Sequence, residues 1–185
     1  MKQLYTEYDQ NEKLQPLVAE ISWTNNTVIM QKCKDLSERE FYLVNLMFNI
    51  RYVIESDKSF WFSLDEYMSV KEFDLKVRDQ RGYVISDGNQ PIGVMRYSLF
   101  WDNLPFLNLI HLEEAFQGEG FGKQAIQVWE NEMRELGYSM VVTSTQVDEE
   151  AQHFYRKLGY VEKGSLTFDH TPCEQPMEIV MMKVL

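Results

Sequence analysis

Apolar residues in the first 50 positions of the chain recur at helical spacing. The residues that would share one helix face are Leu14, Leu17, Val18 and Ile21. Residues 37–40, Ser-Glu-Arg-Glu, have the pattern of a capping box and precede an apolar run that continues to Ile50. The pattern therefore predicts a helical N-terminal extension over residues 1–50, with a module boundary near residue 50.

From residue 51 the spacing changes to that of β-strands. Residues 51–54 are short and β-prone, and Ser63 and Ser69 each open a sequence typical of a helix start. Residues 82–86 and 91–100 flank the turn Asp-Gly-Asn-Gln, which supplies the glycine that a tight turn needs. This part is predicted to contain a β-hairpin.

The rest of the chain alternates strands and helices. The predicted elements are a strand at residues 106–112, an amphipathic helix ended by Gly137, a strand at 140–145, a helix at 149–158 and strands at 161–168 and 177–185. The predicted inward faces comprise Ala125, Ile126, Trp129, Met133 and Leu136 on the long helix, and Ala151, Phe154 and Leu158 on the short one. The order β-β-β-α-β-α-β-β from residue 82 predicts an α/β fold, in which helices cover the faces of a mixed sheet.

Composition narrows the classes of partner. The chain has 185 residues, of which 44% are hydrophobic, so one main domain with a full core is expected. Eighteen Lys and Arg against 29 Asp and Glu give a net charge of −11, which repels phosphate backbones and anionic membranes. We expect no nucleic-acid or membrane partner. Cys33 and Cys173 match no disulfide framework and no apolar run could span a membrane, which favours a cytoplasmic protein.

The sequence contains the motifs of neither a metal site nor a serine hydrolase. The three histidines, His111, His153 and His170, do not have the spacing of metal-ligating pairs, so no metal is expected. No Gly-x-Ser-x-Gly elbow is present either, so hydrolysis by an activated serine is not supported.

The strongest local signal is a glycine cluster at residues 117–123, Gln-Gly-Glu-Gly-Phe-Gly-Lys, between a predicted strand and a predicted helix. Glycines allow close approach of backbone N–H groups, and a helix start adds partial positive charge, so the junction suits a phosphate or pyrophosphate. A dinucleotide fingerprint would need glycine at Lys123, and a P-loop would need glycine at Gln117 and Ser or Thr at Gln124. Neither is supported. A turn that merely permits tight packing remains an alternative.

A second signal is the predicted short helix at residues 149–158, which is followed by Gly159 and Tyr160. Taken alone it is an ordinary amphipathic helix, in which Tyr155 reads as a packed aromatic residue.

Together these two segments resemble the GNAT superfamily of acyl-CoA-dependent N-acetyltransferases. Residues 117–122 match the family's Gln/Arg-x-x-Gly-x-Gly/Ala pyrophosphate loop, and residues 112–116 stand where members often carry Val-x-Pro-x-x. Residues 151–160 look like the family's Ala-x-x-Phe-Tyr-x-Lys-x-Gly-Phe helix. The resemblance covers about residues 51–185 and implies a GNAT-like acetyltransferase domain, a mixed, mostly antiparallel sheet with helices on both faces. Residues 17–42 are similar to the N-terminal helical region of a family of bacterial restriction-like nucleases, without its carboxylate cluster.

The resemblance implies acetyl-CoA as cosubstrate, held at its pyrophosphate by the glycine loop and at its pantetheine arm by the strands at 106–112 and 140–145. The implied binding residues are Leu112, Gln117, Gly118, Glu119, Gly120, Phe121, Gly122, Lys123, Asp148, Ala151 and Tyr155. The chain departs from the family pattern at Asp148, where members often have Asn, and at Glu114, where Pro is common.

The chemistry that the resemblance implies is direct attack of a neutral amine on the thioester in a ternary complex. Backbone N–H groups near Leu112 would stabilise the oxyanion, and Tyr155 would protonate the departing thiolate. His111 and Glu113 are candidates for the general base. His111 could instead be a structural histidine that faces the core. The candidates for acceptor binding are Trp101, Asp102 and Asn108, although Asp102 also suits a turn.

The sequence thus favours an acetyl-CoA-dependent N-acetyltransferase acting on a primary amine of a small molecule or peptide. A catalytically silent CoA-binding or interaction module is the alternative. The apolar helix predicted before residue 50 requires cover, either from the rest of the chain or from a second copy, so a homodimer is a possible assembly.

Overall fold

The computed structural model describes residues 48–167 and 176–185. The chain divides into two compact units, of which residues 50–85 with 92–185 form the larger and residues 1–49 with 86–91 the smaller. The predicted helices before residue 48, and the dimer contact expected of them, lie outside the described residues. The candidate site belongs to the larger unit.

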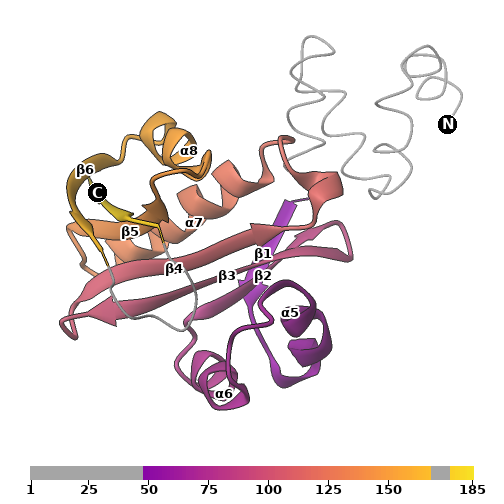
Figure 1. Ribbon diagram of the computed structural model, residues 1–185. Helices are drawn as coiled ribbons and strands as arrows, with labels where there is room; N and C mark the ends of the chain where they lie inside the picture. Colours follow the sequence, from indigo (N-terminus) through magenta and orange to yellow (C-terminus); the bar gives the residue numbers. More distant parts are fainter. Residues whose placement is uncertain (1–47, 168–175) are drawn as a thin grey trace, which may run out of the picture. The chain divides into compact units, whose positions relative to one another are not determined.

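The sheet has seven strands in the order β1-β2-β3-β4-β5-β7-β6. The elements are β1 (Phe48–Tyr52), η1 (Glu55–Asp57), α5 (Lys58–Leu64), α6 (Val70–Arg78), β2 (Gly82–Asp87), β3 (Gln90–Phe100), β4 (Leu104–Leu112), η2 (Glu114–Phe116), α7 (Phe121–Glu135), β5 (Met140–Gln146), α8 (Ala151–Lys157), β6 (Val161–Leu166) and β7 (Glu178–Val184). Strands β4 and β5 run parallel, whereas β3–β4, β5–β7 and β6–β7 are antiparallel pairs. Figure 1 shows α7 and α8 on one face of the sheet and α5 and α6 on the other. The predicted α/β fold class and the element order from residue 82 are confirmed.

Strand β1 corrects the helix that the sequence predicted up to Ile50. Phe48 and Ile50 are partly buried and alternate with exposed Asn49 and Arg51. That two-residue period is the period of a strand, and the apolar run before it concealed the change.

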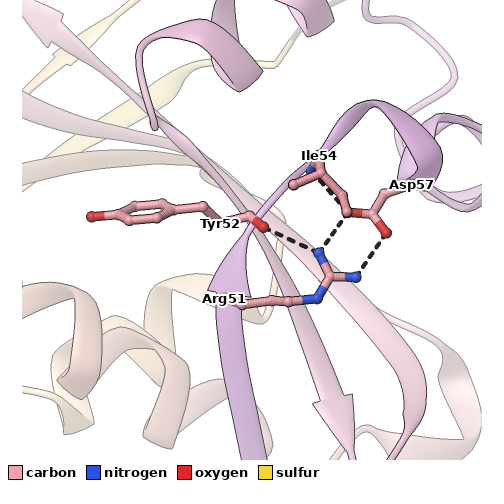
Figure 2. Close-up of polar contacts among 4 residues, drawn as sticks. All are labelled: Arg51, Tyr52, Ile54 and Asp57. Carbon is pink, nitrogen blue, oxygen red and sulfur yellow. Dashed lines mark hydrogen bonds and ion pairs between the residues drawn. The ribbon is translucent and has the colours of Figure 1, made fainter.

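The exit from β1 is fixed by a salt bridge (Figure 2). The Arg51 guanidinium donates to both Asp57 carboxylate oxygens, at 2.6 and 2.7 Å, and to the Tyr52 carbonyl at 3.1 Å. The backbone N–H of Ile54 donates to the same carboxylate at 2.9 Å. The hydrogen bond from Arg51 holds the pKa of Asp57 below its ordinary value.

Of the two helix starts predicted in this part of the chain, the one at Ser69 is confirmed and the one at Ser63 is wrong. Ser69 caps α6 by accepting a hydrogen bond from the backbone N–H of Glu72 at 3.2 Å, as predicted. No helix begins at Ser63, because α5 ends at Leu64. Asp65 turns inward instead, where its buried carboxylate accepts hydrogen bonds from the Trp61 indole at 3.3 Å and from Arg96 Nε at 2.7 Å.

The core has two layers, one on each face of the sheet. Helices α5 and α6 pack over Val53, Val84 and Val94. On the other face α7 buries most of its predicted stripe, and the Trp129 ring lies 5.8 Å from that of Tyr97. Leu136 was wrongly predicted to be buried: it follows the last turn of α7 and is 60% exposed.

Strand β4 carries an irregularity that opens the site. Arg96 pairs with Leu109 and Tyr97 with Leu107, so Asn108 is an extra residue, a β-bulge. On its other side β4 pairs with β5 only at Phe106 and Leu107 in the described strands. Beyond Leu107 the two strands therefore part, toward the start of α7.

Candidate active site

A pocket of about 660 Å³ lies where β4, the glycine loop and α8 meet. Its lining residues are Ile110, His111, Leu112, Gln117, Gly118, Gly120, Gly122, Lys123, Ala151, Phe154, Tyr155, Lys157 and Leu158. The structure thus brings together the two motifs that the sequence singled out. A space of this size is in the range of small-molecule sites.

The glycine loop has the backbone that its composition predicts. Gly118 and Gly120 are left-handed, with φ of 82° and 91°, and a Cβ on either would meet no atom within 4 Å. Gly120 is the N-cap of α7, and its carbonyl accepts the N–H of Gln124 at 3.1 Å. The N–H groups of Gly122 and Lys123 lie in the first turn of α7, before this first helical hydrogen bond, where a helix offers no backbone acceptor. The positive end of the helix dipole therefore lies at the pocket. This geometry suits an anion.

Gln117 lines the pocket, and its side chain also has a structural contact. Its side-chain amide donates to the backbone carbonyl of Leu112 at 2.8 Å, which folds the loop back onto the end of β4. The backbone N–H of Glu113 donates to the carbonyl of Ile92 on β3. In an antiparallel pair, successive residues direct their backbone N–H and C=O groups alternately toward and away from the partner strand, so those of Leu112 point away from β3. The Leu112 N–H therefore faces the gap between β4 and β5.

Gly93 is a residue that sequence reasoning missed. It pairs with Leu112, and a Cβ at this position would lie 2.3 Å from the Leu112 side chain and 2.7 Å from the His111 carbonyl oxygen. Because Gly93 has no side chain, β3 can approach β4 closely behind the pocket. An isolated glycine in a predicted strand is the signal that could have found it.

The pocket is cationic although the chain is acidic. Lys123 and Lys157 line it together with His111, and the lining residues named above include no Asp or Glu. Lys157 was also missed. It lies three residues after Phe154 and therefore on the same face of α8, a spacing that the sequence already contained.

Tyr155 is the buried residue of α8, at 6% exposure, and it borders the pocket. Ala151, Phe154 and Leu158 were predicted to be the inward residues, but they are only half-buried because the pocket lies over them. Burial raises the pKa of Tyr155 to about 12. The Thr143 hydroxyl partly offsets this rise in pKa, and the Glu149 carboxylate adds to it. The phenol is consequently protonated at neutral pH and available as a proton donor.

The predicted residues beside β4 are dispersed. His111 is exposed and lines the pocket, so it does not face the core. Asn108 is exposed at the bulge, and Glu113 is half-buried at the start of η2, outside the lining. Trp101 and Asp102 lie at the tip of the β3–β4 hairpin, at the end of β4 opposite Leu112, and both have left-handed backbones.

The remaining predicted cofactor residues do not line the pocket. Glu119 is exposed in the loop, and Asp148 is exposed between β5 and α8. Phe121 is buried, with its ring 6.2 Å from that of Phe116, and so contributes packing beneath the loop.

The described residues contain no group of three or more His, Cys, Asp or Glu side chains that could hold a metal ion. Over residues 48–167 and 176–185, no helix is long and apolar enough to cross a membrane.

Comparison with known families gives two matches. Residues 38–160 match the family described as Acetyltransferase (GNAT) family, and residues 1–50 match the DUF1016 N-terminal domain. No curated protein matches the sequence.

Several solved structures are similar. A GNAT family acetyltransferase from Elizabethkingia anophelis with acetyl-CoA bound has a TM-score of 0.62 at 19% identity, covering 75% of this chain and 99% of that one. A spermidine N-acetyltransferase chimera, part of it from Vibrio cholerae, has a TM-score of 0.63 at 18% identity, over 75% and 95%. The ribosomal-protein-S18-alanine N-acetyltransferase from Escherichia coli has a TM-score of 0.62 at 15% identity, over 74% and 92%. At these identities the likeness shows a shared fold.

Proposed function

This chain belongs to the acetyltransferase (GNAT) family, and from that premise we propose that it transfers the acetyl group of acetyl-CoA to a primary amine of a small molecule or peptide. The observation that carries the proposal is the pocket at the N-terminus of α7. A left-handed glycine loop, two lysines and a buried tyrosine line one space there.

The anionic end of acetyl-CoA fits the loop. The backbone N–H groups of Gly122 and Lys123 and the dipole of α7 favour a pyrophosphate, and the glycines leave room for it. Lys123 and Lys157 add two positive charges to the same space. The gap between β4 and β5 beyond Leu107 then takes the pantetheine arm.

The transfer is a displacement at the thioester carbonyl. The amine nitrogen forms a bond to the carbonyl carbon, and the Leu112 N–H, which faces the gap, donates to the oxyanion. When the carbon–sulfur bond breaks, the electron pair stays on sulfur and the Tyr155 hydroxyl supplies its proton. The amine loses its own proton to a general base. His111 is the stronger candidate because it lines the pocket, whereas Glu113 lies beside it.

The structural neighbours include enzymes named for spermidine and for a ribosomal-protein alanine, so small amines and peptides both belong in a test. Asn108, at the bulge where the strands part, is the predicted acceptor residue that this proposal retains. Trp101 and Asp102 lie at the far end of β4, and the proposal does not use them.

The test is a thiol-release assay with acetyl-CoA and a panel of amines: spermidine, free amino acids and peptides that begin with alanine. Tyr155→Phe should lower kcat by about tenfold to a thousandfold, because a positioned general acid contributes about 10²- to 10⁴-fold and water can partly replace the missing hydroxyl. The affinity for acetyl-CoA, measured by calorimetry, should stay close to that of the parent.

The matched control is Tyr160→Phe. Tyr160 is also buried and its ring lies 5.4 Å from that of Tyr155, but it does not line the pocket. A similar loss of kcat in both variants would indicate disturbed packing. Acetyl-CoA binding without thiol release from any amine would instead support the silent CoA-binding module.

A further inference from the structure

A second pocket, of about 450 Å³, is bounded by the C-terminal half of α7 and by the outer strands β1 and β2. The residues that line it from α7 are spaced three and four apart and so share one helix face: Val128, Asn131, Glu132 and Glu135. The lining has no residue in common with that of the pocket proposed for acetyl-CoA. The proposed function therefore leaves this second pocket without a role.

The two strands supply an aromatic wall. The rings of Tyr52 on β1 and Tyr83 on β2 lie 5.3 Å apart, tilted by 33°. Figure 2 shows the Tyr52 side chain leaving β1 on the side opposite to that of Arg51. Both tyrosine hydroxyls donate to Oε1 of Glu132, at 2.8 and 2.9 Å, so this carboxylate is held against the wall.

The negative charge of the pocket is not balanced within it. Oε2 of Glu132 and the whole Glu135 carboxylate have no hydrogen bond or ion pair to a described residue. Arg51 is the only Lys or Arg among the lining residues, and its guanidinium is bound to both oxygens of Asp57, at 2.6 and 2.7 Å. The pocket therefore offers two carboxylates that lack a cation.

These groups together suit an organic cation. A carboxylate attracts an ammonium group, and the face of a tyrosine ring attracts it further. Ile50 and Val128 add aliphatic surface to the same lining, which suits an alkyl chain. The described residues contain no group of side chains that could hold a metal ion. The combination of charge, ring and aliphatic wall thus favours an amine.

We propose that the pocket between α7, β1 and β2 binds an alkylammonium ion. The charge of the ligand lies at Glu132 and Glu135, beside the Tyr52 ring. Its alkyl chain lies along Ile50 and Val128. The inference does not depend on acetyl transfer. A free small amine and a lysine side chain of another protein share this chemistry, and the experiment distinguishes these two sources.

The first test locates the ligand without any transfer reaction. Butylammonium chloride is titrated into the isotope-labelled full chain without acetyl-CoA, and the backbone amide signals are followed by NMR. Saturable shifts should gather at residues 128–135, Tyr52 and Tyr83, with a dissociation constant of about 1 mM, because exposed charge contacts and cation–aromatic contacts are each weak. n-Butanol, which has the same chain without the charge, should not saturate. Shifts confined to the acetyl-CoA pocket, or equal binding of n-butanol, would overturn the proposal.

The second test changes the charge of the pocket. Glu135→Gln should weaken butylammonium binding about two- to fivefold, the range for an exposed ion pair, and Glu135→Lys should abolish it by repulsion. The matched control is Glu66→Gln, since Glu66 is exposed between α5 and α6, outside the pocket, and its removal changes the net charge as Glu135→Gln does. The proposal fails if Glu135→Lys binds like the parent, or if Glu66→Gln weakens binding as much as Glu135→Gln, because net charge would then explain the attraction.

The third test separates the ring of Tyr52 from its hydroxyl. Tyr52→Phe keeps the ring and should bind butylammonium within about twofold of the parent. Tyr52→Leu keeps an apolar side chain without the ring and should bind about two- to fivefold more weakly, as expected for an exposed cation–aromatic contact. Equal affinity of these two variants would contradict the proposed geometry.

A last probe, Nα-acetyl-lysine amide, separates the two sources of the cation, because its ammonium belongs to a lysine within a peptide unit. Saturation at the same residues supports docking of a lysine side chain, whereas binding of butylammonium alone supports a free amine. None of these measurements involves thiol release. Loss of the proposed acetyltransferase activity would therefore leave this inference standing, and failure of this site would leave that activity untouched.

Discussion

At Gly120 the backbone is left-handed, with a φ of 91°, and the position of the missing Cβ is open space beside the pocket. An alanine there has two effects. It adds backbone strain, since L-residues resist this conformation, and it places a methyl group where the proposed pyrophosphate lies.

Gly120→Ala should therefore lower the free energy of unfolding by ~1 kcal/mol and weaken acetyl-CoA binding at least about tenfold. Urea unfolding and calorimetry measure the two effects. Gly164→Ala is the matched control, because Gly164 of β6 also has open space at its Cβ but no left-handed backbone. Parental affinity in Gly120→Ala would argue against the loop as the anion site.

The residues of the site divide by whether their role depends on local or distant partners. The loop glycines and Tyr155 belong to motifs of fixed spacing, and the pocket contains them as expected. Gly93 depends on Leu112 of the next strand. No single segment of sequence contains both partners of this contact, so the two motifs did not reveal it.

At the scale of elements, α7 is attached to the edge of the sheet through one carboxylate. The hydroxyls of Tyr52 on β1 and Tyr83 on β2 both donate to Oε1 of Glu132, at 2.8 and 2.9 Å. Burial raises the pKa of both tyrosines, to about 12 for Tyr52, so they remain donors throughout the neutral range. Tyr83 is buried, whereas Tyr52 is partly exposed.

Tyr83→Phe should lower the free energy of unfolding by ~1.5 kcal/mol, the lower end for a hydrogen bond to a charged group. Tyr52→Phe should cost less, because water can replace its exposed hydroxyl. Urea unfolding of both variants measures the difference. Equal losses, or a larger loss for Tyr52→Phe, would show that burial does not decide the strength of these bonds.

The pair of Arg51 and Asp57 joins β1 to η1, and its contribution depends on pH. The pKa of Asp57 is lowered in the folded chain, so its stabilising effect is present above the pKa of the unfolded chain, about 3.9, and is lost as the pH falls through the folded value. The Arg51 side chain is 42% exposed and that of Asp57 13%, so solvent screens the pair in part, and we expect it to be worth ~1 kcal/mol.

We expect Asp57→Asn to be less stable than the parent by up to ~1 kcal/mol at pH 7, and the gap to close below about pH 4. The asparagine oxygen can still accept the Ile54 N–H, which keeps the turn itself intact. Urea unfolding across pH 3–7 measures the gap. A gap as large at pH 3 as at pH 7 would mean that Asp57 acts through shape and not through charge.

The elements that the sequence predicted well have local causes. The hairpin of β2 and β3 follows from its turn residues, and the start of α6 follows from the Ser69 cap. The helix predicted at Ser63 failed because Asp65 is drawn to Arg96, 31 residues away. The helix predicted up to Ile50 failed for a different reason: the alternation of β1 covers only five residues after a longer apolar run.

At the scale of the whole molecule, the charge of the chain and the charge of the pocket have opposite signs. A net charge of −11 repels the phosphates of acetyl-CoA at long range, while Lys123 and Lys157 attract them at contact. The Debye length decides which effect dominates. At 0.1 M salt it is about 10 Å, so distant acidic residues are largely screened and the lysines of the pocket are not.

Lys157→Ala should therefore weaken acetyl-CoA binding by about tenfold at 0.1 M salt, and the ratio to the parent should shrink toward one at 1 M, where the Debye length is about 3 Å. Lys163→Ala changes the net charge equally but lies on exposed β6 outside the pocket, so its affinity should match the parent at both concentrations. Calorimetry of the three proteins at two salt concentrations measures this. If Lys163→Ala weakens binding as much as Lys157→Ala, net charge governs the affinity, and the pocket lysines have no special part in holding acetyl-CoA.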